Sequence, residues 1–330
     1  MALAVACAAP SPSEALLRAE RLERKGRVNE AAAAYDEARQ EAKTPRRRAE
    51  IALRRAELLE SAGRDDDAAR AYLEIERAWA GSPEAARALD HVARLLHARG
   101  GDAGRAEALA VDLRILTSHP DETAADDALA RIVRAHFGRD HELGVALADL
   151  HARLAGRGVD DNVLIEAAEA SRRLGDAETA LRLWAELADA YPRSGLRDDA
   201  LWRAAELRRV RGEFREALEA WRKILATRRD ALIVGSYHSE YLDDAQLQTA
   251  LVWLDDLGNV ARARAALLAL RDDMPWSLLR DDAQFHLARA SARAGDRARA
   301  CGEIALLARR FPDGNQLRRA GALSKELGCR

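Results

Sequence analysis

The sequence predicts an all-α protein, a right-handed α-solenoid of about eight helix pairs closed by a C-terminal capping helix. The first observation is a glycine that returns about every 37 residues, each time between two Ala- and Leu-rich helical patterns. A period in this range is the signature of a helical repeat array. The second is composition, because 48% of the 330 residues are hydrophobic, only 8 are proline and β-branched runs are scarce. The recurring glycines are Gly26, Gly63, Gly100, Gly138, Gly175, Gly212, Gly258, Gly295 and Gly328.

Each repeat is expected to hold two antiparallel helices, called A and B, with the glycine between them. The first helix begins at Ser13, a favourable N-cap, and the array extends over residues 13–327. The A helices are predicted at about 13–25, 46–62, 83–99, 122–137, 161–174, 196–211, 242–257 and 278–294. The B helices are predicted at about 28–42, 65–80, 102–117, 140–155, 176–190, 213–227, 260–272 and 297–310. A last helix at about 314–327 covers the exposed end.

The two kinds of connection differ in chemistry. From A to B, glycine tolerates the left-handed backbone of a chain reversal, and an acidic residue often follows, as in Gly175-Asp176. From B to the next A, proline ends the helix, as at Tyr191-Pro192. A doubled aspartate then begins the A helix, and its recurrence with the repeat predicts a helix cap rather than a metal or acid–base site. The doubled aspartates are Asp126-Asp127, Asp198-Asp199, Asp243-Asp244 and Asp281-Asp282.

The first twelve residues differ from the repeats. Residues 1–9 are apolar but too short for a complete signal peptide, and they lack its positively charged start. The stretch LAVAC, from Leu3 to Cys7, resembles the lipobox of bacterial lipoproteins, in which small residues precede an acylated cysteine. We expect residues 1–12 to be a signal remnant and tether, with Cys7 as the lipidation candidate. The alternative is the disordered N-terminus of a cytosolic protein.

Two further cysteines lie near the C-terminus. Cys301 falls at a small, buried position of a helix, which predicts an inert core thiol. Cys329 lies one residue before Arg330 and is interpreted as a free thiol. Neither cysteine has a C-x-x-C partner or a histidine at metal-site spacing. A disulfide between the two is the alternative, and no sequence pattern supports it.

The chain carries no common catalytic motif. It has no G-x-G-x-x-G, P-loop, H-E-x-x-H, nucleophile elbow or paired C-x-x-C. His91 and His97 are six residues apart, which does not place them on one helix face for a metal. The net charge is −2 and arginines alternate with acids, which argues against a nucleic-acid partner. We predict a non-catalytic protein without cofactor or metal, reaching a membrane only through the possible lipid anchor, since no 18-residue apolar stretch occurs.

One step of the period is longer than the others. Gly212 and Gly258 are 46 residues apart, which indicates an insertion of about nine residues near 228–241. The insertion contains Tyr237, His238 and Tyr241, although only 5% of the chain is aromatic. Loops that interrupt repeats often carry function, so these three residues are candidates for a lip over a groove or a docking element. The alternative is a lengthened loop against the array.

Residues 200–227 resemble a tetratricopeptide repeat (TPR). The TPR pattern of a bulky residue, a small pair, glycine, aromatic-x-x-Ala and an aromatic is met here by Leu201, Ala204-Ala205, Gly212, Phe214, Ala217 and Trp221. The resemblance covers residues 13–327 and is strongest from about 160 to 312. The pitch of 37 exceeds the usual 34 and the A-helix tyrosine is missing. The chain therefore looks like the degenerate TPR class of bacterial envelope proteins, such as outer-membrane assembly lipoproteins and Tol–Pal coordinators.

The TPR resemblance implies a concave groove, lined by A-helix residues, that binds an extended or helical peptide of a partner protein. Trp202 and Phe285 are the expected anchors, because aromatic residues and arginine dominate binding hot spots. The alternative is that these residues pack between repeats. By register with the motif, the other groove candidates are Ile165, Glu169, Arg172, Arg173, Glu206, Arg209, Gln248, Asp255, Arg289 and Arg293.

The leading functional hypothesis is a non-catalytic protein–protein interaction scaffold, anchored through Cys7 as a periplasmic or outer-membrane lipoprotein. The first alternative is a cytosolic TPR scaffold or regulator. The second is an accessory superhelical arm for a peptidoglycan-processing enzyme, in which Arg289 and Arg293 would contact the glycan strand.

Overall fold

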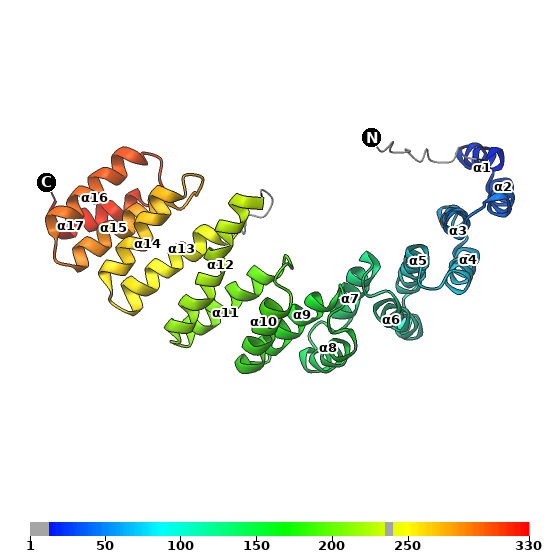
Figure 1. Ribbon diagram of the computed structural model, residues 1–330, viewed down its shortest axis with the longest axis horizontal. Helices are drawn as coiled ribbons and strands as arrows, with labels where there is room; N and C mark the ends of the chain where they lie inside the picture. The colour runs from blue at the N-terminus through cyan, green and yellow to red at the C-terminus, as the bar shows by residue number, and fades with distance from the viewer. Residues whose placement is uncertain (1–12, 235–239, 330) are drawn as a thin grey trace, which may run out of the picture. The chain divides into compact units, whose positions relative to one another are not determined.

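The computed structural model describes residues 13–234 and 240–329 (Figure 1). Every regular element in these two ranges is a helix, and successive pairs form an all-α solenoid, as the glycine period predicts. The chain divides into two compact units, Met1–Glu166 and Ala167–Arg330, and each is described by itself. No helix of the described ranges combines the length and the apolar character that crossing a membrane requires.

The first unit holds four helix pairs and the start of a fifth. Its A helices are α1 (Glu14–Arg24), α3 (Pro45–Ser61), α5 (Pro83–Arg99) and α7 (Thr123–Ala135). Its B helices are α2 (Val28–Glu41), α4 (Asp65–Ala78), α6 (Gly101–Ser118) and α8 (Asp140–Leu154). From α1 to α7 each helix packs against the next, and α9 (Asp160–Arg173) continues from this unit into the second.

The second unit continues the alternation and ends in the capping helix. Its A helices are α11 (Arg197–Val210), α13 (Leu242–Leu251) with the π-helix η1 (Val252–Asp256), and α15 (Arg280–Arg293). Its B helices are α10 (Ala177–Ala190), α12 (Phe214–Val234), α14 (Val260–Asp273) and α16 (Arg297–Arg310). The cap is α17 (Leu317–Leu327), which contacts both α15 and α16.

The recurring glycines have the backbone that the sequence predicts. All nine adopt a positive φ, from 58° at Gly328 to 80° at Gly175. A side chain at such a φ strains the backbone, so glycine is the residue that lets the chain reverse between the two helices of a pair.

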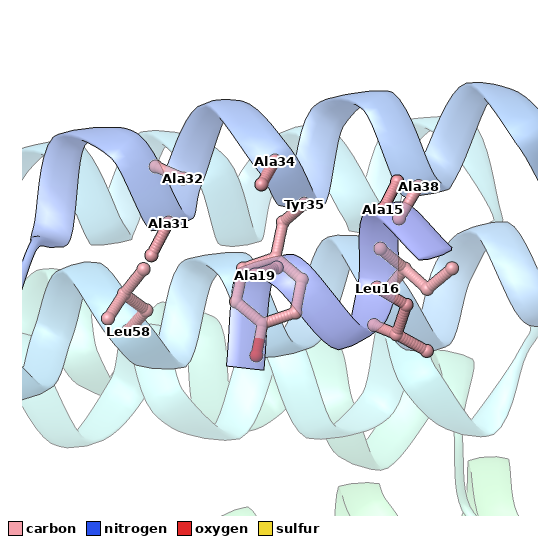
Figure 2. Close-up of a cluster of buried hydrophobic side chains, with 10 residues drawn as sticks. Ala15, Leu16, Ala19, Ala31, Ala32, Ala34, Tyr35, Ala38 and Leu58 are labelled. Carbon is pink, nitrogen blue, oxygen red and sulfur yellow. The ribbon is translucent and has the colours of Figure 1, made fainter. Parts of the chain in front are cut away.

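One bulky side chain of the B helix fills the core of four repeats. These side chains are Tyr35, Tyr72, Trp184 and Trp221, and none is more than 1% exposed. In the first repeat, Tyr35 lies among Ala and Leu side chains of α1, α2 and α3 (Figure 2). Burial of this kind contributes about 1.5–3 kcal/mol per large side chain, so these positions hold each A–B pair together.

Each buried tyrosine also satisfies its hydroxyl. Tyr35 donates to Glu23 Oε2 at 2.5 Å and Tyr72 donates to Glu60 Oε2 at 2.6 Å. Burial, followed by these carboxylates, raises the pKa of both phenols. The two pairs are 37 residues apart, so the polar contact repeats together with the packing.

The doubled aspartates do not cap the helices that they begin, which corrects the prediction. In α11, α13 and α15 the N-cap residue lies two positions before the pair, and no side chain makes a cap hydrogen bond. The carboxylates instead accept from the next repeat: Ser277 Oγ donates to Asp243 Oδ2 at 2.7 Å, and the Asn315 N–H donates to Asp281 Oδ2 at 2.9 Å. The prediction failed because sequence periodicity does not show that the loop before the next A helix packs against the start of the preceding A helix and donates to its aspartates.

The insertion begins as helix rather than as loop. α12 runs for 21 residues to Val234, so part of the 228–241 segment lengthens the B helix. After it, α13 ends in η1, although the sequence predicts a continuous helix to 257. η1 places Asp255 and Asp256 against different repeats, because Arg289 of α15 donates to Asp255 and Arg209 of α11 donates to Asp256. A π-helical turn within an α-helix frequently lies at a functional site.

The two C-terminal cysteines form a disulfide between Cys301 of α16 and Cys329 after α17, with their Cα atoms 5.6 Å apart. The predicted core thiol and free thiol were therefore wrong, and the alternative of a disulfide is correct. The reason is tertiary, because α17 packs back on α15 and α16 and brings the end of the chain beside α16.

Candidate functional site

The predicted groove residues of α11 lie on one face of that helix, but they contact neighbouring repeats. Trp202 stacks on Tyr241 at a ring-centroid distance of 5.2 Å and meets Trp221 at 6.2 Å in a tilted contact. It is half-buried in the apolar cluster around Trp221. Packing between repeats, the alternative from the sequence, describes its position.

Glu206 lies one turn after Trp202 and is half-buried. Its Oε1 atom is buried without a hydrogen-bond partner in the described residues. Burial raises the pKa of the Glu206 carboxyl, the Arg209 cation opposes this, and the Asp244 carboxylate adds to it. Arg209 itself donates to Gln248 Oε1 and lies 3.3 Å from Asp256 Oδ2, so it ties α11 to α13 and η1.

The arginines of α15 are held in the same way. Arg289 donates to Asp255 Oδ1 at 2.8 Å, and Arg293 lies 3.5 Å from the same oxygen. Both side chains remain partly exposed, at 33% and 49%. The two arginines therefore share one carboxylate, which ties both side chains to η1 and neutralises part of their charge.

The predicted residues of α9 follow the same rule. Glu169 is 9% exposed, and it accepts from Arg172 at 3.0 Å and pairs with Arg203 of α11 at 2.7 Å. Ile165 is 8% exposed and belongs to the core, whereas Arg173 is exposed. Of this set, Arg172 and Arg173 present the most side-chain surface.

Phe285, the second expected anchor, is 4% exposed. Its ring packs with Leu307 of α16 and Ala320 of α17, and the Arg319 guanidinium lies 4.7 Å from the ring centre. The capping helix therefore covers Phe285, and it packs between repeats as the alternative interpretation states.

The insertion candidates are only partly described. Tyr237, His238 and Cys7 lie outside the described residues. Tyr241 donates to Asp199 Oδ1 at 2.7 Å, and burial, followed by this carboxylate, raises its pKa to about 12. Tyr241 therefore links the start of α13 to the start of α11.

An open apolar surface lies in the first unit instead, and we call it the α7–α9 groove. It is a cavity of about 370 Å³ between two A helices. Its apolar lining includes the buried Leu129, the half-buried Val133 and Phe137, which is 91% exposed in the turn after α7. The full lining is Asp126, Leu129, Ala130, Val133, Arg134, Phe137, Asn162 and Glu166.

The rim of the α7–α9 groove is polar and mostly acidic. Asn162 donates to Asp126 Oδ1 at 3.0 Å across the groove. Burial raises the pKa of Asp126, and the carboxylates of Asp161 and Asp127 act in the same direction. The rim thus concentrates carboxylates around an apolar floor, which favours a ligand with an apolar side chain and a nearby cation.

The motif-based selection of candidates missed this groove. Leu129 and Val133 are four residues apart, which places them along one side of α7, and Phe137 follows in the turn after the helix. That spacing was the available signal. It was overlooked because the register with the TPR pattern is strongest after residue 160, where the candidates were chosen.

Within the described ranges, no group of three or more His, Cys, Asp or Glu side chains is placed to hold a metal ion. The described residues of the candidate sites provide an apolar cavity, paired charges and stacked aromatic rings.

Residues 282–314 match the family model of the tetratricopeptide repeat. The matched segment holds most of α15, all of α16 and the turn that follows. It contains Gly295, one of the recurring glycines that predict the repeat array. No protein of curated function shows significant sequence similarity to this chain.

Several solved structures are similar to this chain. The C-terminal part of a TPR repeat-containing protein from Cytophaga hutchinsonii is 10% identical, with 92% of this chain and 98% of that chain covered and a TM-score of 0.40. A putative kinesin light chain with TPR-like repeats from Podospora anserina is 15% identical, with 74% and 98% covered and a TM-score of 0.38. The apo form of RapI is 10% identical, with 95% and 81% covered and a TM-score of 0.43. At these identities no function transfers to this chain.

Proposed function

We propose that this protein is a non-catalytic scaffold that holds a partner protein through a peptide segment bound in the α7–α9 groove. The observation that carries the proposal is the Phe137 ring, which is 91% exposed beside a cavity of about 370 Å³. Contiguous exposed apolar surface with a polar rim marks interaction sites on soluble proteins. A helical repeat array suits this role because its stacked A helices form an extended binding surface.

The rim defines the partner segment further. An apolar side chain fills the cavity beside Val133 and Phe137, and a Lys or Arg next to it meets the carboxylate of Asp126. Such a basic group contributes mainly to specificity and association rate, because the rim is open to solvent and screened by salt.

Photo-crosslinking in cells tests the site. A photo-reactive phenylalanine analogue replaces Phe137, and the matched control places it at Val210, which is 85% exposed at the end of another A helix. We expect a discrete adduct at position 137 that is absent at 210 and is lost when Val133→Asp is added. The same adducts at both positions, or none at 137, would contradict the proposal.

We also propose that the scaffold is a cell-envelope lipoprotein acylated at Cys7 and located in the periplasm or at the outer membrane. Cys7 lies outside the described residues, so the support is its lipobox-like sequence together with the Cys301–Cys329 disulfide. Disulfides persist in oxidising compartments and are rare in a reducing cytosol.

The test of the setting is the intact mass and fractionation of the protein expressed from its native locus, beside Cys7→Ser. An acylated membrane form that the substitution abolishes is the expected result. An unmodified form in the cytosolic fraction would favour the cytosolic scaffold or regulator instead. The peptidoglycan-arm hypothesis has less support, because Arg289 and Arg293, its expected glycan contacts, both pair with Asp255.

A further inference from the structure

A second groove lies on the B-helix side of the first unit, and we call it the α2–α4 groove. It is lined by α2 from Asn29 to Arg39, by α3 from Ala52 to Leu59, and by α4 with its flanking residues from Arg64 to Trp79. Two cavities, of about 460 and 410 Å³, share part of this lining and therefore form one continuous groove. It belongs to helices other than those of the α7–α9 groove.

The α2–α4 groove carries more cations than anions. Three carboxylates line it, from Asp36, Asp67 and Glu74. Five arginines face them: Arg39, Arg55, Arg64, Arg70 and Arg77. The groove is therefore basic, although the whole chain has a net charge of −2.

The pairing inside the groove leaves this excess available. Asp36 accepts from two arginines, Arg39 and Arg55, each at 3.0 Å. Asp67 is likewise shared by Arg64 and Arg70. One carboxylate between two guanidinium groups cannot satisfy the donors of both, since each guanidinium has five N–H groups in a fixed fork.

Arg77 strengthens this conclusion. Arg77 makes no ion pair or hydrogen bond among the described residues, and it lines the same cavity as the half-buried Trp79. An exposed guanidinium and an indole ring in one cavity are suited to hold a carboxylate and an apolar side chain of the same ligand.

The shape of the groove limits the occupant. Ala52 and Ala71 form part of its floor, and small side chains allow a peptide backbone to approach closely. Its length follows the fifteen-residue step from Arg64 to Trp79 along α4, which is about 22 Å. An extended segment of about six or seven residues has this length.

We propose that the α2–α4 groove binds an extended acidic segment of a partner protein, with carboxylates spaced along it and an apolar residue at the Trp79 end. Guanidinium forks match carboxylates in a bidentate geometry, which makes arginine the residue of choice for such recognition. The carboxylates of Asp36, Asp67 and Glu74 interleave with the arginines and disfavour a polymer with a charge on every unit, such as single-stranded nucleic acid.

Fluorescence anisotropy with the full chain tests this site. The probe is a labelled nine-residue peptide in which Glu or Asp alternates with Leu, Ser and one terminal Phe, measured at about 50 and 200 mM salt because surface ion pairing is screened. The matched control peptide has Gln and Asn in place of the acids. We expect binding of the acidic peptide that weakens at the higher salt, and at least tenfold weaker binding of the control peptide.

Matched variants locate the contact. Arg70→Glu with Arg77→Glu reverses two exposed charges of the groove, and Arg105→Glu is the control because Arg105 pairs with Asp102 as Arg70 pairs with Asp67. We expect at least a tenfold loss of affinity in the double variant and less than a twofold change in the control. Arg77→Gln, a milder change, should lose affinity to a lesser degree with unchanged circular dichroism.

Three outcomes would overturn the proposal. The first is no binding of the acidic peptide by the unaltered chain, and the second is an equal loss in Arg105→Glu. The third is tighter binding of a single-stranded oligonucleotide of equal charge through the same arginines. Crosslinking at Phe137 does not depend on any of these three outcomes. The proposals for the α2–α4 groove and the α7–α9 groove are therefore tested independently.

Discussion

The A-helix faces of the two units use similar residues in different ways. In the second unit, the charged side chains of α11, η1 and α15 pair from one repeat to the next, and Trp202 stacks on Tyr241. In the first unit, Arg131 of α7 pairs with the buried Asp112, and Phe137 beside the α7–α9 groove stays exposed. Register with the repeat therefore predicts the helix face on which a residue lies. It does not predict whether side chains of the neighbouring repeat pack against that residue and cover it.

The largest expected effect comes from breaking the buried pair of the first unit. Arg131 donates to Asp112 at 2.8 Å, and Asp112 is fully buried, with His97 on its second oxygen. Arg131→Met leaves this carboxylate buried without its cation, at a cost of about 3–5 kcal/mol. Hydrogen exchange of α5 to α7 measures the loss, and Arg134→Met, an exposed change on the same helix, is the control. A loss of less than about 1 kcal/mol would show that the pair is not structural.

The second prediction concerns the cap of the second unit. The Cys301–Cys329 disulfide closes a loop with a sequence separation of 28. Cys301→Ser should cost about 3 kcal/mol by the chain-entropy argument, confined to α16 and α17. The rate of limited proteolysis near the C-terminus measures this loss of stability. A reductant should increase that rate for the unsubstituted chain and leave it unchanged for the variant. Equal protease resistance of the two chains would contradict the prediction.

The third prediction is a pH dependence of the second unit. His286 is 6% exposed, and this burial is the largest cause that lowers its pKa to about 4. The cations of Arg289 and Arg319 lower the pKa further, and the carboxylate of Asp255 opposes them. An unfolded histidine titrates near 6.5, so the unfolded chain binds the proton more readily and stability falls as the pH drops from about 6.5 to 4. The loss should approach about 3 kcal/mol.

His286→Gln is the matched control for this pH dependence, because glutamine does not titrate in that range. Acids with a raised pKa, such as Glu206 and Asp244, change stability in the opposite direction, so only the difference between the two chains isolates His286. Parallel stability–pH curves for the two chains would refute the assignment.

The fourth prediction separates packing from binding at Trp202. Trp202→Ala removes the ring contacts with Tyr241 and Trp221 and should cost about 2 kcal/mol, less than a fully buried tryptophan. A double-mutant cycle with Tyr241→Leu should give a coupling of about 0.5–1.5 kcal/mol. A lost partner adduct with unchanged stability would instead identify Trp202 as a binding anchor.

The smallest effect is expected at the rim of α15. Arg293 is 49% exposed and lies 3.5 Å from Asp255, which Arg289 already contacts at 2.8 Å. Arg293→Ala should change stability by less than about 0.5 kcal/mol, as most surface ion pairs do. Thermal unfolding of Arg293→Ala and Arg289→Ala, measured side by side, should show the smaller loss of stability for Arg293→Ala. A larger loss of stability for Arg293→Ala would contradict this prediction.

Much of the fold could be predicted, because its signals are local. The glycines, with their positive φ, give every helix pair, and outside the insertion and η1 the predicted helix ends agree to within three residues. Trp184 and Trp221 occupy the buried positions that the TPR pattern assigns to them. Tyr237, His238 and Cys7 lie outside the described residues, and their roles remain predictions.

The candidate site was harder to predict, because each groove is made by side chains from different repeats. Trp202 and Phe285 have the residue type of anchors, yet Tyr241 and α17 occupy their surroundings. Phe137 has no special motif, yet nothing in the described residues covers its ring, which is 91% exposed.

By itself, the sequence determined the repeat length and the helix pairs, because these follow from periodicities of a few residues and from glycine at the turns. Only the tertiary structure decided which donors form hydrogen bonds with the carboxylates of Asp243 and Asp281. It also decided that Cys301 pairs with Cys329 and which A-helix surface stays exposed. These contacts join residues 28 to 36 positions apart, and they depend on how one repeat packs on the next. That packing is set by the summed shape of many side chains, which no single motif encodes.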